Sequence, residues 1–285
     1  MKPRKAATGR ATVLAITSGK GGVGKTNVTI NVAIAMARLG LRVGILDADF
    51  GLGNVDVLLG ITPVAHVGHV VAGEKQLRDI VVRGPHGITI IPASSGLQSM
   101  TSLSGVQRDR LLAALDLACR DLDFLLIDTA AGISDNVMDM LKLAERVVVV
   151  TSLEPSAIVD AYALTKVLTG ADAGKDIGVV VNGARTAEEA GLAFRQLETA
   201  TRRFLKRSVA YYGHITDDPA VRDSVLVQRA IVDVLPQSPA SRCYRIVASR
   251  LAGLGPAQGG LRRAARGTSS SDGAVAAAGK VAQCA

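Results

Sequence analysis

Two lysines within one glycine-rich segment are the residues of this sequence best suited to phosphate chemistry. Residues 19–26 read Gly-Lys-Gly-Gly-Val-Gly-Lys-Thr and fit the phosphate-loop pattern G-x4-G-K-[ST] at every position. The glycines let successive backbone N–H groups turn inward around an anion, because no Cβ hinders the turn. In this pattern Lys25 holds the β- and γ-phosphates of a nucleoside triphosphate, and the Thr26 hydroxyl ligates Mg2+. The residues expected to surround the phosphates are Gly19, Lys20, Gly21, Gly22, Val23, Gly24, Lys25, Thr26 and Asn27.

Two aspartates follow an apolar run at residues 42–46, where a strand would end. Asp47 and Asp49 are separated by one residue, so strand alternation puts them on the same side if the strand continues that far. One carboxylate would then face Mg2+ and the other would face the attacking water.

A third aspartate follows the apolar run at residues 123–127. Asp128 has the usual form of a Walker B acid, which holds Mg2+ through a water molecule. The residues after it, 128–133, are typical of a loop that senses the γ-phosphate, with Gly132 free to bring its N–H to that group. The metal ligands expected from these patterns are Thr26, Asp49 and Asp128.

The elements that must position these residues alternate between strand and helix. The expected strands cover residues 12–17, 42–46, 87–91, 123–127, 147–150, 177–181 and 208–212. The expected helices cover residues 26–39, 103–120, 155–168, 187–204 and 239–254. This order predicts a doubly wound α/β fold, that of a P-loop NTPase, with a mostly parallel sheet of about seven strands and helices on both faces. Ligands of such sheets bind at the carboxyl ends of the strands, where Lys25, Asp49, Asp128 and Asn182 all fall.

Composition supports a large core and argues against several other classes of protein. The chain is 48% hydrophobic but only 3% aromatic, which suits a parallel sheet covered by helices. It contains no uncharged apolar run of 18 residues, so we expect no transmembrane helix. The three cysteines, Cys119, Cys243 and Cys284, lie far apart, which argues against disulfides and zinc sites and favours a reducing cytoplasm.

The net charge of +8 is concentrated at the two ends of the chain. Residues 1–10 hold four bases and no acids, and residues 241–285 hold seven bases and one acid. Such ends attract nucleic acid or anionic lipid in some proteins and are simply solvated in others. We expect a basic tail at 1–10, an ATPase domain at 11–254, and a disordered tail rich in Gly, Ser and Ala at 255–285.

Several stretches of the sequence resemble a known family. Residues 18–26, 46–60 and 126–133 resemble the deviant-Walker ATPases of the MinD/ParA group. Within that group, residues 84–93, 154–163, 180–182 and 217–221 are similar to the flagellar-number regulators of the FlhG family, also called FleN or YlxH. The likeness covers roughly residues 11–254, and its motifs are far more specific than a phosphate loop alone.

The resemblance implies a switch that dimerises around ATP. Lys20 would reach across the interface to the partner's ATP phosphates, as an arginine finger does, and hydrolysis would release the homodimer. Asp49 would be the switch I acid that orients the water, and Asp128 the Walker B acid. The implied cofactors are ATP and Mg2+, and the implied catalytic residues are Lys20, Lys25 and Asp49. The implied adenine contacts come from Asn182, whose amide supplies a donor and an acceptor, and from the loop around Asp218 and Pro219.

Related functions in this group need sequence features that this chain lacks. Nitrogenase-type relatives carry cysteines in the switch loops, iron–sulfur carriers and tail-anchored-protein targeting factors use a C-x-x-C pair, and bacterial tyrosine kinases carry a C-terminal tyrosine cluster. Residues 261–266 are basic but too short and weakly apolar to predict a MinD-type membrane helix. Residues 1–10 lack the Asp-Gln-Ala-x-x-Leu-Arg segment with which some FlhG proteins stimulate the GTPase FlhF, which puts that route in doubt.

We therefore expect a cytoplasmic, Mg-dependent ATPase switch, slow without a partner, that regulates flagellar number or placement. The candidate partners are an FlhF-type GTPase and a flagellar transcription activator. A peripheral location at an anionic membrane or at the cell pole stays open, and no specific nucleic acid is expected. The alternatives are a MinD-like membrane-associated positioning ATPase and a ParA-like DNA-partitioning ATPase, which liposome pelleting and salt-dependent DNA binding would detect.

Overall fold

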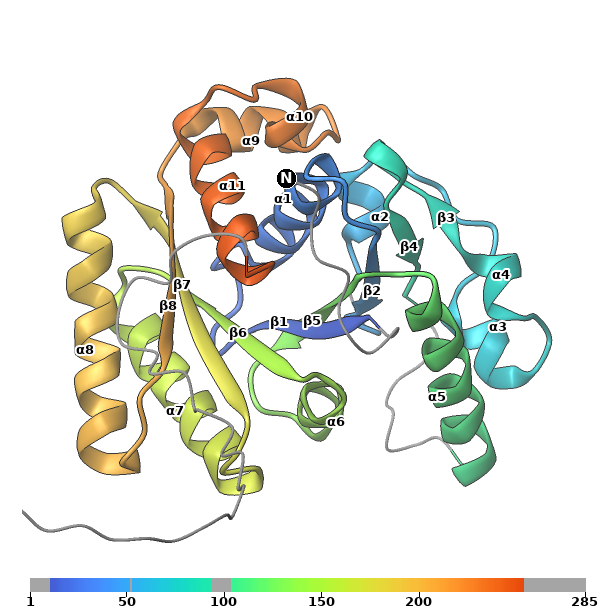
Figure 1. Cartoon of the computed structure of the whole chain (residues 1–285), viewed down its shortest axis with the longest axis horizontal. Helices are drawn as coiled ribbons and strands as arrows, with labels where there is room; N and C mark the ends of the chain where they lie inside the picture. The colour runs from blue at the N-terminus through green and yellow to red at the C-terminus, as the bar shows by residue number, and fades with distance from the viewer. Residues whose placement is uncertain (1–10, 52, 94–103, 254–285) are drawn as a thin grey trace, which may run out of the picture.

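Short apolar runs pair side by side into one sheet in the computed structural model, which describes residues 11–51, 53–93 and 104–253 (Figure 1). The sheet has eight strands in the order β3-β4-β2-β5-β1-β6-β7-β8. The strands are β1 (Thr12–Ser18), β2 (Val43–Ala48), β3 (Val82–Arg83), β4 (Thr89–Ile91), β5 (Phe124–Ala131), β6 (Arg146–Thr151), β7 (Asp176–Ala184) and β8 (Ala210–Thr216). The neighbouring strands pair in parallel, except that β3 runs antiparallel to β4 at one edge.

Helices cover both faces of this sheet. They are α1 (Lys25–Arg38), α2 (Val55–Leu58), α3 (Val67–Ala72), α4 (Leu77–Ile80), α5 (Gly105–Arg120), α6 (Asp135–Leu143), α7 (Pro155–Ala171), α8 (Ala187–Leu205), α9 (Pro219–Leu226), α10 (Ile231–Val234) and α11 (Pro239–Leu251), with one 3-10 turn at Pro85–Gly87. Helices α1, α10 and α11 pack on one face, and α3 to α8 pack on the other (Figure 1). The sheet is thus buried on both sides, as its continuous apolar strands require.

The central strand β1 shows how the sequence divides the core into two layers. Successive side chains of a strand point to opposite faces of the sheet. Val13 and Ala15 accordingly pack in the cluster under α5 to α8, whereas Leu14 and Ile16 pack in the cluster under α1 and α11. All four residues are buried, so the strand is held from both sides and its carboxyl end is fixed in space.

The predicted fold class is confirmed: the sheet is doubly wound and mostly parallel, with helices on both faces. The additional eighth strand is β3, whose two residues are too few to leave a sequence pattern. Strand β8 runs to Thr216, beyond the predicted end at residue 212, because Gly213 adopts a φ of 129° and the pairing with β7 continues past it.

The tails predicted at 1–10 and 255–285 lie outside the described residues. Among the helices that the structure does describe, none has the length and hydropathy needed to cross a membrane.

Candidate functional site: a phosphate loop with two separated lysines

The loop between β1 and α1 occupies the carboxyl end of the central strand. Gly24 has a φ of 86°, and a Cβ there would lie 2.3 Å from the side-chain nitrogen of Asn182. Gly19 is equally restricted, because a Cβ would lie 2.3 Å from the backbone carbonyl of Asp160 in α7. Only glycine fits at these two positions, so the backbone wraps tightly and directs the N-terminus of the 14-residue helix α1 at the loop.

Lys25 and Asp128 meet beneath the loop as a buried ion pair. Lys25 is 9% exposed and Asp128 is 1% exposed, and the Lys25 Nζ lies 3.5 Å from the Asp128 Oδ1. The Thr29 hydroxyl donates a 2.7 Å hydrogen bond to the same oxygen. Burial raises the pKa of the Asp128 carboxyl above its ordinary value, while the Lys25 ammonium and the Thr29 hydroxyl oppose that rise. The two predicted residues are therefore adjacent, although they stand more than 100 positions apart in the sequence.

A hollow of about 420 Å³ opens above this pair and contains most of the predicted phosphate and metal residues. Its lining includes Lys25, Thr26 and Asp49, together with the loop residues Gly21, Gly22, Gly24 and Asn27. Backbone N–H groups, the Lys25 ammonium, the Thr26 hydroxyl and the Asp49 carboxylate are a set of groups that suits a nucleotide phosphate with a hard divalent cation. The residues present therefore fit ATP with Mg2+.

The two aspartates after β2 have different environments. Strand β2 ends at Ala48, so the alternation that would place Asp47 and Asp49 on one side stops before Asp49. Asp47 is 2% exposed and accepts backbone N–H bonds of 3.1 Å from Asp49 and from Val55. Burial, with a further contribution from the nearby Asp128 carboxylate, raises the pKa of Asp47 to about 7. Asp47 thus fastens the loop from Asp49 to Val55, and Asp49 is the one of the two that lines the hollow.

Gly132 lies at the end of β5 with a φ of 96°. Its N–H donates a 2.8 Å hydrogen bond to the carbonyl of Ser18, at the base of the phosphate loop. The predicted contact of this N–H with a γ-phosphate would require that bond to be exchanged, and it stays a prediction.

Lys20 belongs to a second hollow, of about 290 Å³, on the other side of the loop. Its Nζ forms an ion pair with Glu154 and a 3.0 Å hydrogen bond with the Ser156 hydroxyl. Both charged side chains are open to solvent, Lys20 at 38% and Glu154 at 63%. The hydrogen bond from Lys20 and its positive charge lower the pKa of Glu154. Lys20 is therefore separated from Lys25 and does not line the hollow that Lys25 lines.

Two of the three residues expected at adenine, Asn182 and Asp218, hold neighbouring segments together. Asn182 lines the second hollow and donates a 2.8 Å hydrogen bond to the carbonyl of Val23 in the phosphate loop. Asp218 caps α9 by accepting the N–H of Ala220 at 3.0 Å and also accepts the N–H of Ala240 at 3.2 Å. Pro219 is the first residue of α9. Neither Asp218 nor Pro219 lines the two hollows, so their contact with a base stays a prediction.

Sequence reasoning did not assign a role to Thr29, Glu154 or Ser156. Thr29 stands four residues after Lys25 on α1, a spacing that places both side chains on the same helix face, so this partner of Asp128 was detectable. Glu154 and Ser156 leave no comparable signal, because their contact with Lys20 joins segments more than 130 positions apart.

A parallel sheet with a phosphate loop at the end of its central strand and a buried carboxylate beside the loop lysine defines a P-loop NTPase. The model of the ParA family, described as "NUBPL iron-transfer P-loop NTPase", matches residues 10–252. The chain belongs to this family of P-loop ATPases. Its three cysteines form no C-x-x-C pair, and the described residues hold no group of three or more His, Cys, Asp or Glu side chains arranged for a metal.

Two individual relatives and one solved structure are similar to this chain over most of its length. The antiactivator FleN of Pseudomonas aeruginosa is 45% identical over 239 residues, covering 84% of this chain and 85% of FleN. The flagellum site-determining protein YlxH of Helicobacter pylori is 30% identical, covering 85% of this chain and 82% of YlxH. Among solved structures, a chain of the MinC:MinD cell division complex of Aquifex aeolicus superposes with a TM-score of 0.72 at 28% identity, covering 89% and 99% of the two chains.

Proposed function

We propose that this protein is an ATP-dependent dimerising switch that regulates flagellar number or placement through protein partners. The similarity to FleN over most of both chains supports the flagellar role. The similarity to YlxH, a site-determining protein, supports a role in flagellar placement as well as number.

The separation of the two loop lysines is the observation that best supports a switch that dimerises. Lys25 is buried beside Asp128, at the phosphate hollow of its own chain, whereas Lys20 faces the second hollow and solvent. A positive charge stabilises developing phosphate charge only where it can reach it. In our proposal Lys20 leaves Glu154 and Ser156 when two copies meet and then serves the nucleotide held by the second copy.

The other site residues bind the phosphates, position the attacking water and hold the metal ion. Lys25 and the backbone N–H groups of the loop hold the phosphates, and Asp49 positions the attacking water. Thr26 and Asp128 would hold Mg2+, which would supply positive charge that neutralises the phosphates. Turnover is slow in the monomer because the second positive charge is absent from the site until dimerisation.

Dimerisation would create the surface to which partner proteins bind. A flagellar transcription activator is the partner class closest to the description of FleN as an antiactivator. An FlhF-type GTPase and an anionic membrane surface are further candidates, and the protein would then act in the cytoplasm or at the inner face of the membrane.

Complementation tests this function directly. The gene would replace that of FleN in a strain lacking it, and flagella per cell would be counted by electron microscopy. The wild type should restore the normal number, and Lys20→Ala should not. Lys142→Ala is the matched control, because Lys142 is also an exposed, ion-paired lysine but lies on α6 with Asp139. Failure of the wild type to restore the number, with normal protein levels, would refute the flagellar role.

A further inference from the structure

Thr29 stands one turn after Lys25 on α1 and is buried beside Asp128. Its hydroxyl oxygen lies 3.1 Å from the Lys25 carbonyl, the bond that a threonine within a helix ordinarily makes, and 2.7 Å from the Asp128 Oδ1. The hydroxyl has one proton, so it can donate to only one of these two oxygens. The shorter distance and the charge of the carboxylate favour Asp128, because hydrogen bonds to ionised acceptors are shorter and stronger than those to neutral ones.

The contacts of Thr29 and Lys25 with Asp128 are made to the same carboxylate oxygen. The Lys25 Nζ lies 3.5 Å from Oδ1, the oxygen to which the Thr29 hydroxyl also donates. These two contacts leave Oδ2 unused, and the carboxylate cannot turn about its Cβ–Cγ bond without breaking both of them. Asp128 is buried, so water cannot take over either contact. The Thr26 hydroxyl also forms a hydrogen bond with this carboxylate, so Asp128 is adjacent to the residue expected to ligate Mg2+.

The direction of the Asp128 carboxylate matters for the metal ion that it is expected to hold. Mg2+ requires near-ideal octahedral geometry, so a misdirected oxygen weakens its binding. Residues that hold a metal ligand in place by a hydrogen bond typically contribute about 10–100-fold to metal affinity or activity. Thr29 lines neither of the two hollows at the phosphate loop, so it can influence the metal only through Asp128.

We propose that Thr29 is a positioning residue for the metal: its hydroxyl fixes the Asp128 Oδ1 and thereby leaves Oδ2 to hold the Mg2+ that accompanies ATP. This inference rests on the proposed ATPase function, in which Asp128 holds that ion. The phosphate-loop pattern ends at Thr26 and assigns no role to the residue three positions later. Removal of the Thr29 hydroxyl should therefore weaken the contribution of the metal and leave phosphate binding by Lys25 and the loop N–H groups in place.

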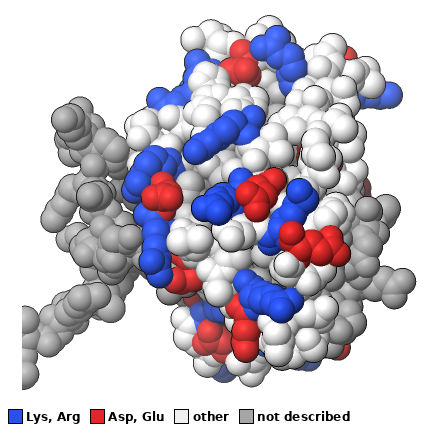
Figure 2. Space-filling model, turned by 90° about the vertical axis from the view of Figure 1, so that its right-hand side faces the viewer, with Lys and Arg blue, Asp and Glu red and all other residues white. Residues whose placement is uncertain are grey.

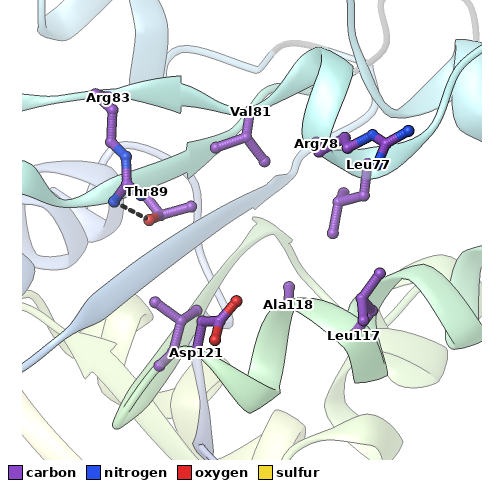
Figure 3. A pocket seen from close by; sticks show the side chains of 9 residues that line it. Leu77, Arg78, Val81, Arg83, Thr89, Leu117, Ala118 and Asp121 are labelled. Atoms are coloured by element: carbon purple, nitrogen blue, oxygen red, sulfur yellow. Dashed lines mark hydrogen bonds between the residues drawn. The ribbon is translucent and has the colours of Figure 1, made fainter.

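Thr89 provides a matched control away from the metal site. Its hydroxyl is also bonded to a charged group, because the Arg83 Nη1 donates to it at 3.1 Å (Figure 3). Both residues line a hollow between α4 and the end of α5, on the side of the molecule where acidic and basic side chains are interleaved (Figure 2). Neither residue lines the hollows at the phosphate loop. Thr89→Val therefore removes a hydroxyl from a charged partner and leaves the metal site intact.

Calorimetry with the non-hydrolysable β,γ-imido analogue of ATP tests the proposal on the full chain. The dissociation constant would be measured with Mg2+ and with EDTA, and the ratio of the two values is the gain in affinity that the metal supplies. The wild type should show a gain, and Thr29→Val should lose about tenfold of it while its affinity in EDTA stays within about twofold of the wild type. Thr29→Ser, which keeps the hydroxyl, and Thr89→Val should both retain the gain of the wild type within about twofold.

Several outcomes would overturn the inference. An unchanged gain in Thr29→Val would do so, and so would an equal loss of affinity with Mg2+ and with EDTA, because Thr29 would then only shape the loop. Loss of the gain in Thr29→Ser would contradict a role of the hydroxyl. Thr29→Ala removes the same hydroxyl with a smaller side chain and repeats the test if the valine variant does not fold. A wild type that gains nothing from Mg2+ would refute the metal role of Asp128 itself, which distinguishes failure of the proposed function from failure of the role of Thr29.

Discussion

Replacement of Thr29 by valine tests whether the Thr29 hydroxyl holds a charged Asp128 carboxylate in the buried part of the site. Valine has nearly the shape of threonine, so the change removes the 2.7 Å hydrogen bond to the Asp128 Oδ1 and adds little strain. Thr29 and Asp128 are 0% and 1% exposed, so water cannot replace the lost donor. The carboxylate keeps the Lys25 ammonium at 3.5 Å as its main partner.

The expected cost follows from the charge of the acceptor. A hydrogen bond to a buried charged group contributes about 1.5–3 kcal/mol, whereas one between neutral groups contributes about 1 kcal/mol. Thr29→Val should therefore lower the free energy of unfolding by about 2 kcal/mol. For a domain of this size that corresponds to a fall in Tm of about 4–8 °C.

A threonine on another helix gives the matched control. Thr165 is 0% exposed and donates a 2.7 Å hydrogen bond to the Ala161 carbonyl, a neutral acceptor that helix geometry already satisfies. Urea denaturation of Thr165→Val should show a loss of less than about 1 kcal/mol. Equal losses in the two variants, or a Tm for Thr29→Val within about 1 °C of the wild type, would refute a charged Asp128 held by Thr29.

Two further substitutions test the phosphate site, and one labelling experiment tests the environment of Cys243. Lys25→Ala should abolish ATP binding measured by calorimetry, and micromolar affinity in that variant would refute its phosphate role. Asp49→Ala should bind ATP but stop phosphate release, so normal turnover would exclude Asp49 as the residue that positions water. Burial raises the pKa of the Cys243 thiol, but hydrogen bonds from His214 and Thr216 outweigh it and lower the pKa to about 7. Alkylation of Cys243 by iodoacetamide, followed by peptide mass spectrometry, should therefore rise with a midpoint near pH 7 and leave the buried Cys119 slow; a midpoint near the ordinary thiol value of about 8.5 would contradict this environment.

The parts of the structure that the sequence predicted are those governed by local pattern. The phosphate loop, its strand and its helix follow from adjacent residues, and the carboxyl ends of parallel strands must meet at one edge of the sheet. Lys25, Thr26 and Asp49 therefore lie together in one hollow, as expected. Helix α6 was missed although its buried residues Val137, Met138, Met140 and Leu141 follow helical spacing, so the signal was present in the sequence.

The features of the site that the sequence did not predict depend on contacts between distant segments of the chain. The role of Asp47 is set by the backbone of Val55, and the position of Lys20 is set by Glu154, the residue just before α7. No local pattern distinguishes an aspartate that fastens a loop from one that faces a metal.

Mass measurement by light-scattering chromatography tests the central claim, that ATP joins two copies through Lys20. The protein would carry Asp49→Ala to retain ATP and would be run with ADP and with ATP, with and without Lys20→Ala. We predict a monomer with ADP, a dimer with ATP, and a monomer in both nucleotides once Lys20 is removed. A monomer with ATP bound in the Asp49→Ala protein, or an ATP-dependent dimer that survives Lys20→Ala, would contradict the switch.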